Sequence, residues 1–221
     1  MHRIVEPELM NDKAQAEAYA MADFAQSDKL IADAFELHFP CTERQGNILD
    51  LGCGPGNMTF QVAQRFPKCQ VLGIDGSTEM IRLANARIPE SNTRDRVTFI
   101  TGVIPDAMLP QQHYAAIVSN SLLHHLHHPE VLWRTINQYS SSGTHILIAD
   151  LFRPARQQDA LHIVKKYSAD EPDILQRDFY HSLLAAFTPG EIAQQLASAG
   201  LDELKLEKIT DRHILIFGTK T

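Results

Sequence analysis

The sequence contains few cysteines and no long hydrophobic run. Its 221 residues include only three cysteines, Cys41, Cys53 and Cys69. An odd number of widely spaced cysteines matches neither a disulfide framework nor a zinc site. No segment approaches the ~18 apolar residues of a membrane-spanning helix, and the N-terminus lacks the apolar core of a signal peptide. These absences predict a cytoplasmic protein with reduced thiols and no membrane partner.

Clusters of basic residues are also scarce. The formal net charge is −7, and Lys165-Lys166 is the only adjacent pair of basic side chains. An acidic chain repels phosphate backbones unless a local basic patch overcomes its field. The charge therefore argues against nucleic acid as a partner. Hydrophobic residues make up 44% of the chain and charged residues 21%, so a globular core is expected.

Beyond residue 45, short apolar runs alternate with segments of helical periodicity. This alternation predicts a parallel sheet covered on both faces by crossover helices. Apolar runs such as 115–118 suit strands that are buried on both sides. The predicted strands are 47–51, 70–75, 96–101, 114–120 and 144–150, and the predicted helices are 57–66, 78–87, 129–139 and 189–199.

The two ends of the chain differ from this pattern. Residues 205–209 and 213–218 read as strands separated by only three residues, which forces an antiparallel hairpin. Residues 8–38 contain neither proline nor glycine and read as helical until Pro40. We therefore expect an α/β fold, a Rossmann-like three-layer sandwich with a mostly parallel seven-stranded sheet and an antiparallel C-terminal strand. Residues 1–44 would form an N-terminal helical cap, and residues 45–221 one domain with a lid insertion at about 155–188.

A glycine-rich turn follows the first predicted strand. Residues 48–57 read Ile-Leu-Asp-Leu-Gly-Cys-Gly-Pro-Gly-Asn, with glycines at 52, 54 and 56 that allow a ligand to approach the main chain. The third glycine comes too early for the pyrophosphate-binding fingerprint of dinucleotide folds. Asp50 precedes the turn, where it could accept hydrogen bonds from an ammonium group.

A second carboxylate, Asp75, ends the next predicted strand 19 residues after Gly56. A carboxylate at this place can accept hydrogen bonds from both hydroxyls of a ribose. The competing reading is that Asp75 only begins the turn Asp75-Gly76-Ser77, because aspartate is common in turns. The spacing from the glycine turn favours the ligand role.

These residues resemble the class I S-adenosylmethionine-dependent methyltransferase family, particularly its small-molecule branch. The resemblance covers about residue 45 to the C-terminus, and Leu-Asp-Leu-Gly-Cys-Gly-Pro-Gly is among the family's more specific short signatures. It implies S-adenosylmethionine as methyl donor and S-adenosylhomocysteine as product. The donor-binding residues that it implies are Asp50, Gly52, Cys53, Gly54, Gly56, Asp75, Gly76, Ser77, Met80 and Asn120. One departure is Val103, which stands where the family often has an acid that contacts adenine; the next acid is Asp106.

Methyl transfer is an in-line displacement at a carbon that the sulfonium already activates, so the protein mainly positions the reactants. A base is needed only when the nucleophile carries a proton. His124 and His125 are the candidate catalytic residues, because neutral imidazole is the natural base near pH 7. His124 and His128 share the i, i+4 spacing of some metal ligands, but no nearby cysteine or carboxylate completes a ligand set, so no metal site is predicted.

The candidate acceptor-binding residues follow from position. Asp150 and Arg153 stand at the end of the fifth strand, where ligands bind in open α/β sheets, although they could simply cap the chain before Pro154. Arg177, Tyr180 and His181 lie in the lid insertion, which could equally be a solvated helix pair. In the cap, Tyr19 with Phe24 could cover the sulfonium through cation–π contact, or they could only anchor a helix.

The sequence thus predicts a methyltransferase that acts on a small molecule at oxygen, nitrogen or carbon. Two alternatives stay open: a non-catalytic domain that keeps the cofactor pocket, and a nicotinamide-dependent oxidoreductase. The early third glycine and the C-terminal hairpin count against the oxidoreductase. The acceptor and the choice between a monomer and a homodimer are not fixed by these patterns.

Overall fold

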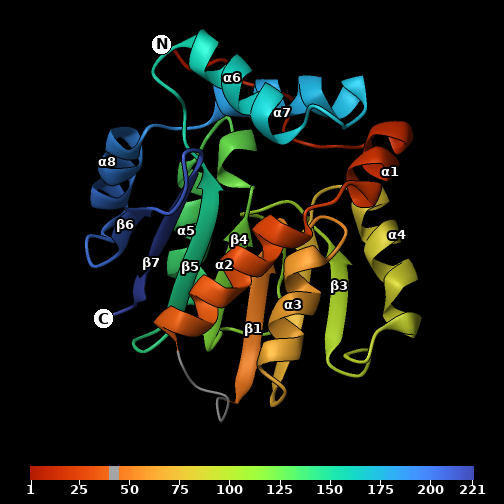
Figure 1. The fold of residues 1–221 in the computed structure, drawn as a ribbon. Coiled ribbons are helices and arrows are strands. Elements are labelled where there is room, and N and C mark those ends of the chain that lie inside the picture. Colours follow the sequence, from red (N-terminus) through yellow and green to blue (C-terminus); the bar gives the residue numbers. More distant parts are fainter. Residues whose placement is uncertain (40–44) are drawn as a thin grey trace.

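A computed structural model describes residues 1–39 and 45–221; Pro40 and Cys41 lie outside the described residues. Seven strands form one sheet in the order β3-β2-β1-β4-β5-β7-β6 (Figure 1). Strand β7 runs antiparallel to β5 and to β6, and the other pairs are parallel. The strands are β1 (Gly46–Leu51), β2 (Cys69–Asp75), β3 (Val97–Thr101), β4 (Ala116–Asn120), β5 (His145–Leu151), β6 (Lys205–Lys208) and β7 (His213–Thr219). The predicted fold class is confirmed.

Helices cover both faces of the sheet, because both faces of its central strands are apolar. In β1, Ile48 joins the core under one helical layer, and Leu49 and Leu51 join the core under the other. The first layer consists of α2 (Ala25–His38), α3 (Asn57–Arg65) and α4 (Thr78–Arg87); the second consists of α5 (Glu130–Tyr139) and α8 (Pro189–Ala199). The result is the three-layer sandwich that the alternating pattern predicts (Figure 1).

The region predicted as a lid folds as a helix pair, α6 (Gln157–Tyr167) and α7 (Asp173–Ala185). The pair lies across the ends of the strands, at the top of Figure 1. It has its own apolar cluster, in which Ile163 and Val164 of α6 pack with Leu183 and Leu184 of α7. The insertion is therefore an ordered layer above the C-terminal edge of the sheet.

The N-terminal region departs from the single helix predicted over residues 8–38. Two helices form instead, α1 (Lys13–Met21) and α2, and the chain before them is extended. Asp12 accepts a hydrogen bond from the Gln15 amide and starts α1, while Ala22 takes an extended conformation and ends it. Asp23 then accepts from the Ala25 amide at the start of α2. Aspartates that bond nearby amides favour caps over helix interiors, which explains the interruption.

The extended residues 1–12, here called the N-terminal strap, cross the C-terminal edge of the sheet. The Ile4 amide donates to the Leu184 carbonyl, and the Arg3 guanidinium donates to the carbonyls of His124 and Leu126. Ser77 Oγ donates to the Met10 carbonyl at 2.7 Å. The strap thus lies between the α6–α7 pair and the strand ends.

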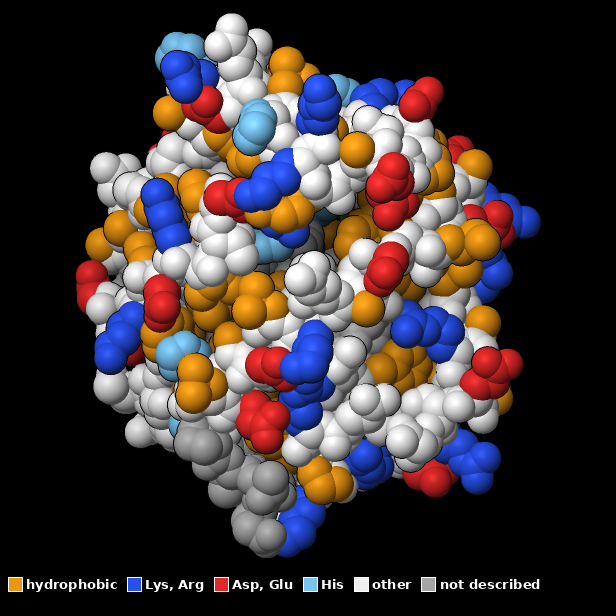
Figure 2. Space-filling view, viewed as in Figure 1, with side chains coloured by type: hydrophobic (Ala, Val, Ile, Leu, Met, Phe, Trp, Pro, Cys, Tyr) orange, Lys and Arg blue, Asp and Glu red, His pale blue; other side chains and the backbone are white. Residues whose placement is uncertain are grey.

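The exposed surface mixes both signs of charge. On the face in Figure 2, acidic and basic side chains are interspersed, and no broad basic area is visible. Within the described residues, no helix has the length and apolar character needed to cross a bilayer.

Candidate functional site

Two adjoining cavities of about 240 Å³ each open at the C-terminal edge of the sheet. The loop cavity is bordered by the glycine turn, the ends of β2 and β4, and the N-terminal strap. The cap cavity is bordered by α1, α2, α7 and the short helix η2 (Leu123–His125). Six residues line both cavities: Met10, Tyr19, Asp28, Asn120, Ser121 and His125. The two cavities therefore share part of their walls.

The floor of the loop cavity is exposed main chain. Gly54 has φ +52°, and a Cβ atom placed on it would meet no atom within 4 Å, so this residue opens onto the cavity. Gly56 has φ +85°, but a Cβ there would stand 2.7 Å from the Phe99 ring. The two glycines serve different purposes: Gly54 leaves space for a ligand, and Gly56 allows close packing at the start of α3.

Asp75 organises the glycine turn from the end of β2. Its Oδ2 accepts a hydrogen bond from the Gly54 amide at 2.9 Å, and its Oδ1 accepts from the Ser77 amide at 2.8 Å. Burial raises the pKa of the Asp75 carboxyl, although both amide hydrogen bonds oppose the rise. Each carboxylate oxygen has a second lone pair, so both can still accept hydrogen bonds from a ligand.

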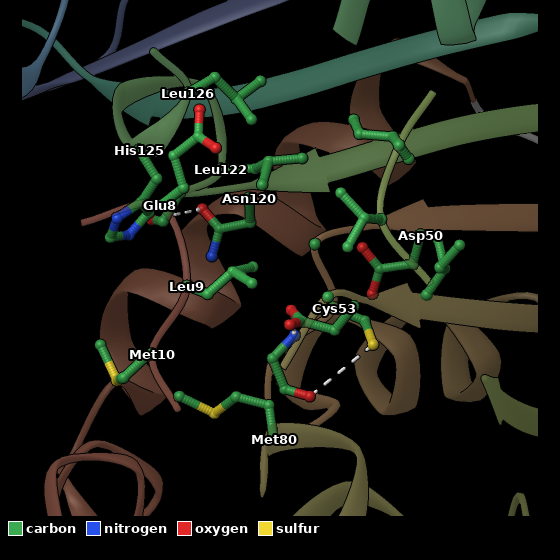
Figure 3. Close-up of a pocket in the computed structure, with 18 of the residues that line it drawn as sticks. Glu8, Leu9, Met10, Asp50, Cys53, Met80, Asn120, Leu122, His125 and Leu126 are labelled. Atoms are coloured by element: carbon green, nitrogen blue, oxygen red, sulfur yellow. Dashed lines mark hydrogen bonds between the residues drawn. The ribbon is translucent and has the colours of Figure 1, made fainter. Parts of the chain in front are cut away.

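Asp50 lines the loop cavity across from the N-terminal strap (Figure 3). Its Oδ2 accepts from the Thr59 hydroxyl at 2.6 Å, while its buried Oδ1 has no hydrogen-bond partner among the described residues. Burial raises the pKa of the Asp50 carboxyl to about 7, and the charges of Asp75 and Asp28 add to the rise that the Thr59 hydrogen bond opposes. An unsatisfied buried acceptor that lines a cavity is a place for a ligand's donor group.

A third carboxylate, Asp28, was not predicted from the sequence as a site residue. It projects from α2 and lines both cavities. Burial raises the pKa of its carboxyl to about 6, against the effects of a hydrogen bond with Asn57 and the charge of Arg87. No local pattern distinguishes Asp28 from a solvent-facing helical acid; only the packing of α2 against the sheet directs it inward. Three carboxylates around one cavity favour a cationic ligand.

The N-terminal strap supplies a further wall that the sequence did not predict. Figure 3 shows Glu8, Leu9 and Met10 on the side of the cavity that faces Asp50 and Met80. Leu9 packs so closely that a Cβ on Gly76 would lie 2.6 Å from its Cδ2. The sequence predicted a helix from residue 8, and a helix over residues 8–10 would not cross the strand ends. For that reason the sequence did not indicate that these residues line the cavity.

Most of the predicted donor-binding residues come together in the loop cavity. Those that line it are Asp50, Gly52, Cys53, Gly54, Asp75, Gly76, Met80, Asn120 and Tyr19. Gly56 and Ser77 instead lie behind the lining: Gly56 packs against Phe99, and the Ser77 side chain caps α4 by accepting from the Met80 amide. Val103 lines the cavity and Asp106 does not, so Asp106 does not replace the acid missing at 103.

The predicted histidine pair lies where the cavities meet. His125 lines both cavities, and His124 lines the cap cavity. His124 Nδ1 stands 2.6 Å from Asp150 Oδ1, and this contact with the charge of Asp150 raises the pKa of His124 although burial opposes it. Burial and the neighbouring His124 lower the pKa of His125 well below its ordinary value. Asp150, predicted to contact the acceptor, is buried and instead holds His124.

The other predicted acceptor residues lie outside the lining of both cavities. Arg177, Tyr180 and His181 are on α7, but the face of α7 that lines the cap cavity carries different side chains. That face consists of Leu175, Asp178, Phe179 and Ser182. These positions follow the i, i+3, i+4, i+7 spacing of one helical face. The predicted segment thus lines the cap cavity, but with a face of α7 that does not carry Arg177, Tyr180 or His181.

Arg153 has a structural role in place of the predicted one. Its buried guanidinium donates to the Ala186 carbonyl at 2.8 Å and to Glu191 Oε1 at 2.7 Å. Glu191 also closes a capping box with Thr188 at the start of α8. Arg153 therefore ties the end of β5 to the start of α8.

Replacing Arg153 should change stability and leave ligand binding intact. Arg153→Ala leaves the Ala186 carbonyl without its side-chain donor, so we expect the free energy of unfolding to fall by about 1–3 kcal/mol in chemical denaturation. The control is Arg177→Ala, whose side chain is 63% exposed and should change stability by less than about 0.5 kcal/mol. A loss of acceptor affinity in Arg153→Ala with unchanged stability would contradict this role.

Comparison with known proteins agrees with this geometry. Residues 48–141 match the family model described as "Methyltransferase domain". This span includes the glycine turn, Asp75 and the histidine pair. Residues 48–141 thus carry a methyltransferase domain. The strap, α1, α2 and the α6–α7 pair, which complete the cavities, lie outside the matched residues.

Curated relatives of the methyltransferase domain match over short segments. A trans-aconitate 2-methyltransferase of Streptomyces avermitilis is 41% identical over 78 residues, which cover 34% of this chain and 28% of the relative. A malonyl-[acyl-carrier protein] O-methyltransferase of Priestia megaterium is 38% identical over 74 residues, covering 34% and 25%. The chain thus spans about a quarter of the length of these relatives.

Solved structures resemble the whole fold. A putative S-adenosyl-L-methionine-dependent methyltransferase of Methanococcus maripaludis superposes with a TM-score of 0.72 at 18% identity, covering 99% of this chain and 97% of that one. The plantazolicin methyltransferase BpumL, in complex with a triazolic desmethylPZN analog and SAH, superposes with a TM-score of 0.71 at 18% identity, covering 94% and 91%. At this identity, the likeness supports the fold.

Proposed function

We propose that the protein binds S-adenosylmethionine in the loop cavity and transfers its methyl group to a small molecule held in the cap cavity. The observation that carries this proposal is the floor of the loop cavity. The exposed main chain at Gly54 is flanked by the carboxylates of Asp28, Asp50 and Asp75, within or beside the matched methyltransferase domain.

The residues of the loop cavity fit the parts of this donor. The buried Asp50 Oδ1, which lacks a partner among the described residues, suits the ammonium group of the methionine end. Asp75 suits the ribose hydroxyls, and Met80 with Val103 offers an apolar border for adenine. The donor carries a sulfonium and an ammonium, so three nearby carboxylates complement its positive charge.

The shared lining of the two cavities supports transfer between them. The rings of Tyr19 and Phe24 are tilted by 40° to each other, with centroids 4.7 Å apart, beside the junction. An aromatic face there favours a sulfonium. Asn120 ends β4 at the same junction. A donor bound along the glycine turn would thus direct its methyl group toward the cap cavity.

The protein's contribution to this reaction is mainly positioning. The bound donor supplies a methyl group on a sulfonium, which the acceptor's nucleophilic atom displaces in line. The cap cavity would hold that atom beside His124 and His125, using an apolar wall from Phe24 and Phe179 and the polar side chain of Ser182. The buried thiol of Cys53 and the absence of a membrane-crossing helix among the described residues support our further proposal that this occurs in the cytoplasm.

A binding and transfer experiment tests the function. At about 100 times its dissociation constant, S-adenosylhomocysteine should raise the melting temperature by roughly 5–10 °C, and NADH should leave it unchanged. Radiolabelled methyl groups from S-adenosylmethionine should then appear in a member of a broad metabolite panel. A shift with NADH alone would support an oxidoreductase, and tight donor binding without transfer would support a non-catalytic domain.

The raised carboxyl pKa values predict that donor binding releases protons. Asp50 titrates near pH 7 and Asp28 near pH 6 in the free protein, so both are partly protonated at pH 6. A cationic donor favours their charged forms, and affinity should therefore increase as pH rises from about 5.5 to 7.5. Calorimetry in buffers of different ionisation enthalpy measures the proton release directly.

The matched variants for this prediction are Asp50→Asn and Asp95→Asn. Asp50→Asn should weaken binding and flatten the increase between pH 6 and 7.5, because its side chain no longer titrates. The side chain of Asp95 is 89% exposed, so Asp95→Asn should leave the pH dependence of donor affinity unchanged. An affinity that rises as pH falls would oppose the assignment of the ammonium group to Asp50.

A further inference from the structure

Glu6, His124 and His125 form a cluster beside the junction of the two cavities. Glu6 Oε1 lies 3.2 Å from His125 Nδ1 and 3.7 Å from His124 Nε2. One ligand atom from each of the three residues lies within 4.8 Å of the others. Two ligands of one tetrahedral zinc ion, each about 2.1 Å from it, stand ~3.4 Å apart. The two separations from Glu6 to the histidines are therefore close to the spacing of ligands around one metal ion.

Neighbouring groups orient both imidazoles for this purpose. His124 Nδ1 bonds to Asp150 Oδ1 at 2.6 Å, which directs Nε2 toward Glu6. Asp150 is itself fixed by the amides of Leu123 and Leu151. A histidine held by a carboxylate through its other nitrogen is the usual outer arrangement of a metal ligand.

His125 provides the second independent sign. Its Nδ1 is buried and has no hydrogen-bond partner among the described residues, while its ring bonds the Pro7 carbonyl. The free lone pair thus faces Glu6, whose Oε1 also accepts from the Ser182 hydroxyl at 3.1 Å. Native proteins rarely leave a buried polar atom without a hydrogen-bond partner. The unpartnered Nδ1 of His125 therefore indicates a site for a bound ligand.

We propose that Glu6, His124 and His125 bind one divalent transition-metal ion, with Asp150 as the positioning residue for His124. Two imidazoles and one carboxylate suit zinc or iron(II) and disfavour magnesium, which prefers oxygen ligands and water. An ion bound there replaces any proton on His124 Nε2.

Both histidines line the cap cavity, so an ion held between them would lie at the wall of that cavity. An ion there would bind an oxygen or nitrogen atom of the acceptor and favour its deprotonated form. This role at the acceptor rests on the proposed methyl transfer, whereas metal binding itself does not. The two claims are therefore separated by measuring metal binding and S-adenosylhomocysteine binding on the same samples.

The test uses the full chain without an affinity tag, stripped with a chelator and titrated with Co²⁺ and Zn²⁺. We expect one equivalent to bind, visible Co²⁺ absorption bands that Zn²⁺ removes and millimolar Mg²⁺ does not, and metal in the protein by elemental analysis. Glu6→Gln and His125→Ala should each weaken Zn²⁺ binding at least ~100-fold. Asp150→Asn should weaken it about 10- to 100-fold.

The controls are His113→Ala and Glu90→Gln, two exposed residues of the same types. Both should bind Zn²⁺ as the unmodified protein does. An unchanged circular dichroism spectrum and a cooperative melting transition without ligand show that each variant is folded; Glu6→Gln keeps the size of the side chain for this reason. The proposed metal site is wrong if the unmodified protein binds neither Zn²⁺ nor Co²⁺, or if Glu6→Gln binds Zn²⁺ as tightly as the unmodified protein does. Either result would leave the test of S-adenosylhomocysteine binding unaffected.

Discussion

Gly54→Val should abolish donor binding while leaving the protein folded. The added side chain points into space that is empty of protein atoms within 4 Å and that lines the loop cavity. It would occupy the place where we propose that the methionine part of the donor lies against the main chain. We expect S-adenosylhomocysteine affinity to fall by more than ~100-fold and its melting shift to vanish.

The control separates this blockage from backbone strain. Gly143 has φ +90°, and a Cβ on it would likewise meet nothing within 4 Å, but it lies in the turn before β5 and lines neither cavity. Because both glycines have a positive φ, valine at either position should lower the free energy of unfolding by about 1–3 kcal/mol. Gly143→Val should therefore lose similar stability and keep donor affinity. Tight donor binding by Gly54→Val would refute the proposed site.

Asp75→Ala has the second largest expected effect. Its carboxylate bonds the amides of Gly54 and Ser77 and is proposed to bond the ribose. Hydrogen bonds to a charged group contribute about 1.5–3 kcal/mol, so we expect donor affinity to fall about 10- to 150-fold by calorimetry. The loss should be larger for S-adenosylhomocysteine than for a fragment without ribose.

Asp202→Ala, at an exposed position, is the matched control and should not change affinity. Asp75→Asn should fall between the two, because its amide keeps one acceptor oxygen. Unchanged affinity in Asp75→Ala would mean that the aspartate only starts a turn, which was the competing interpretation of the sequence.

The strands and helices of the sheet were predictable to within a residue or two. The predicted helix over 78–87 coincides with α4, and the predicted strand over 70–75 differs from β2 only by Cys69. Buried strands are continuous apolar runs and amphipathic helices repeat every 3.6 residues, so both signals are local. The antiparallel hairpin was equally local, because three linking residues permit no crossover.

The cap was less predictable because its interruptions depend on single polar side chains. Asp12 and Asp23 bond amides two or three residues away and thereby start α1 and α2 separately, in a segment whose composition favours one continuous helix. On α7, the sequence analysis chose Tyr180 and His181, whereas their neighbours Phe179 and Ser182 line the cavity. Periodicity identifies a helix, whereas the direction of its faces depends on what it packs against.

The sequence by itself determined the sheet, the glycine turn and the two carboxylates at 50 and 75, because these features arise from contacts within a few residues and from strand ends that must meet at one edge. Only the tertiary structure brought Asp28 and the N-terminal strap to that edge, and with the strap came Glu6 beside His124 and His125. Residues separated by more than a hundred positions leave no spacing pattern in the chain. Their meeting depends on how α1, α2 and the α6–α7 pair pack over the sheet.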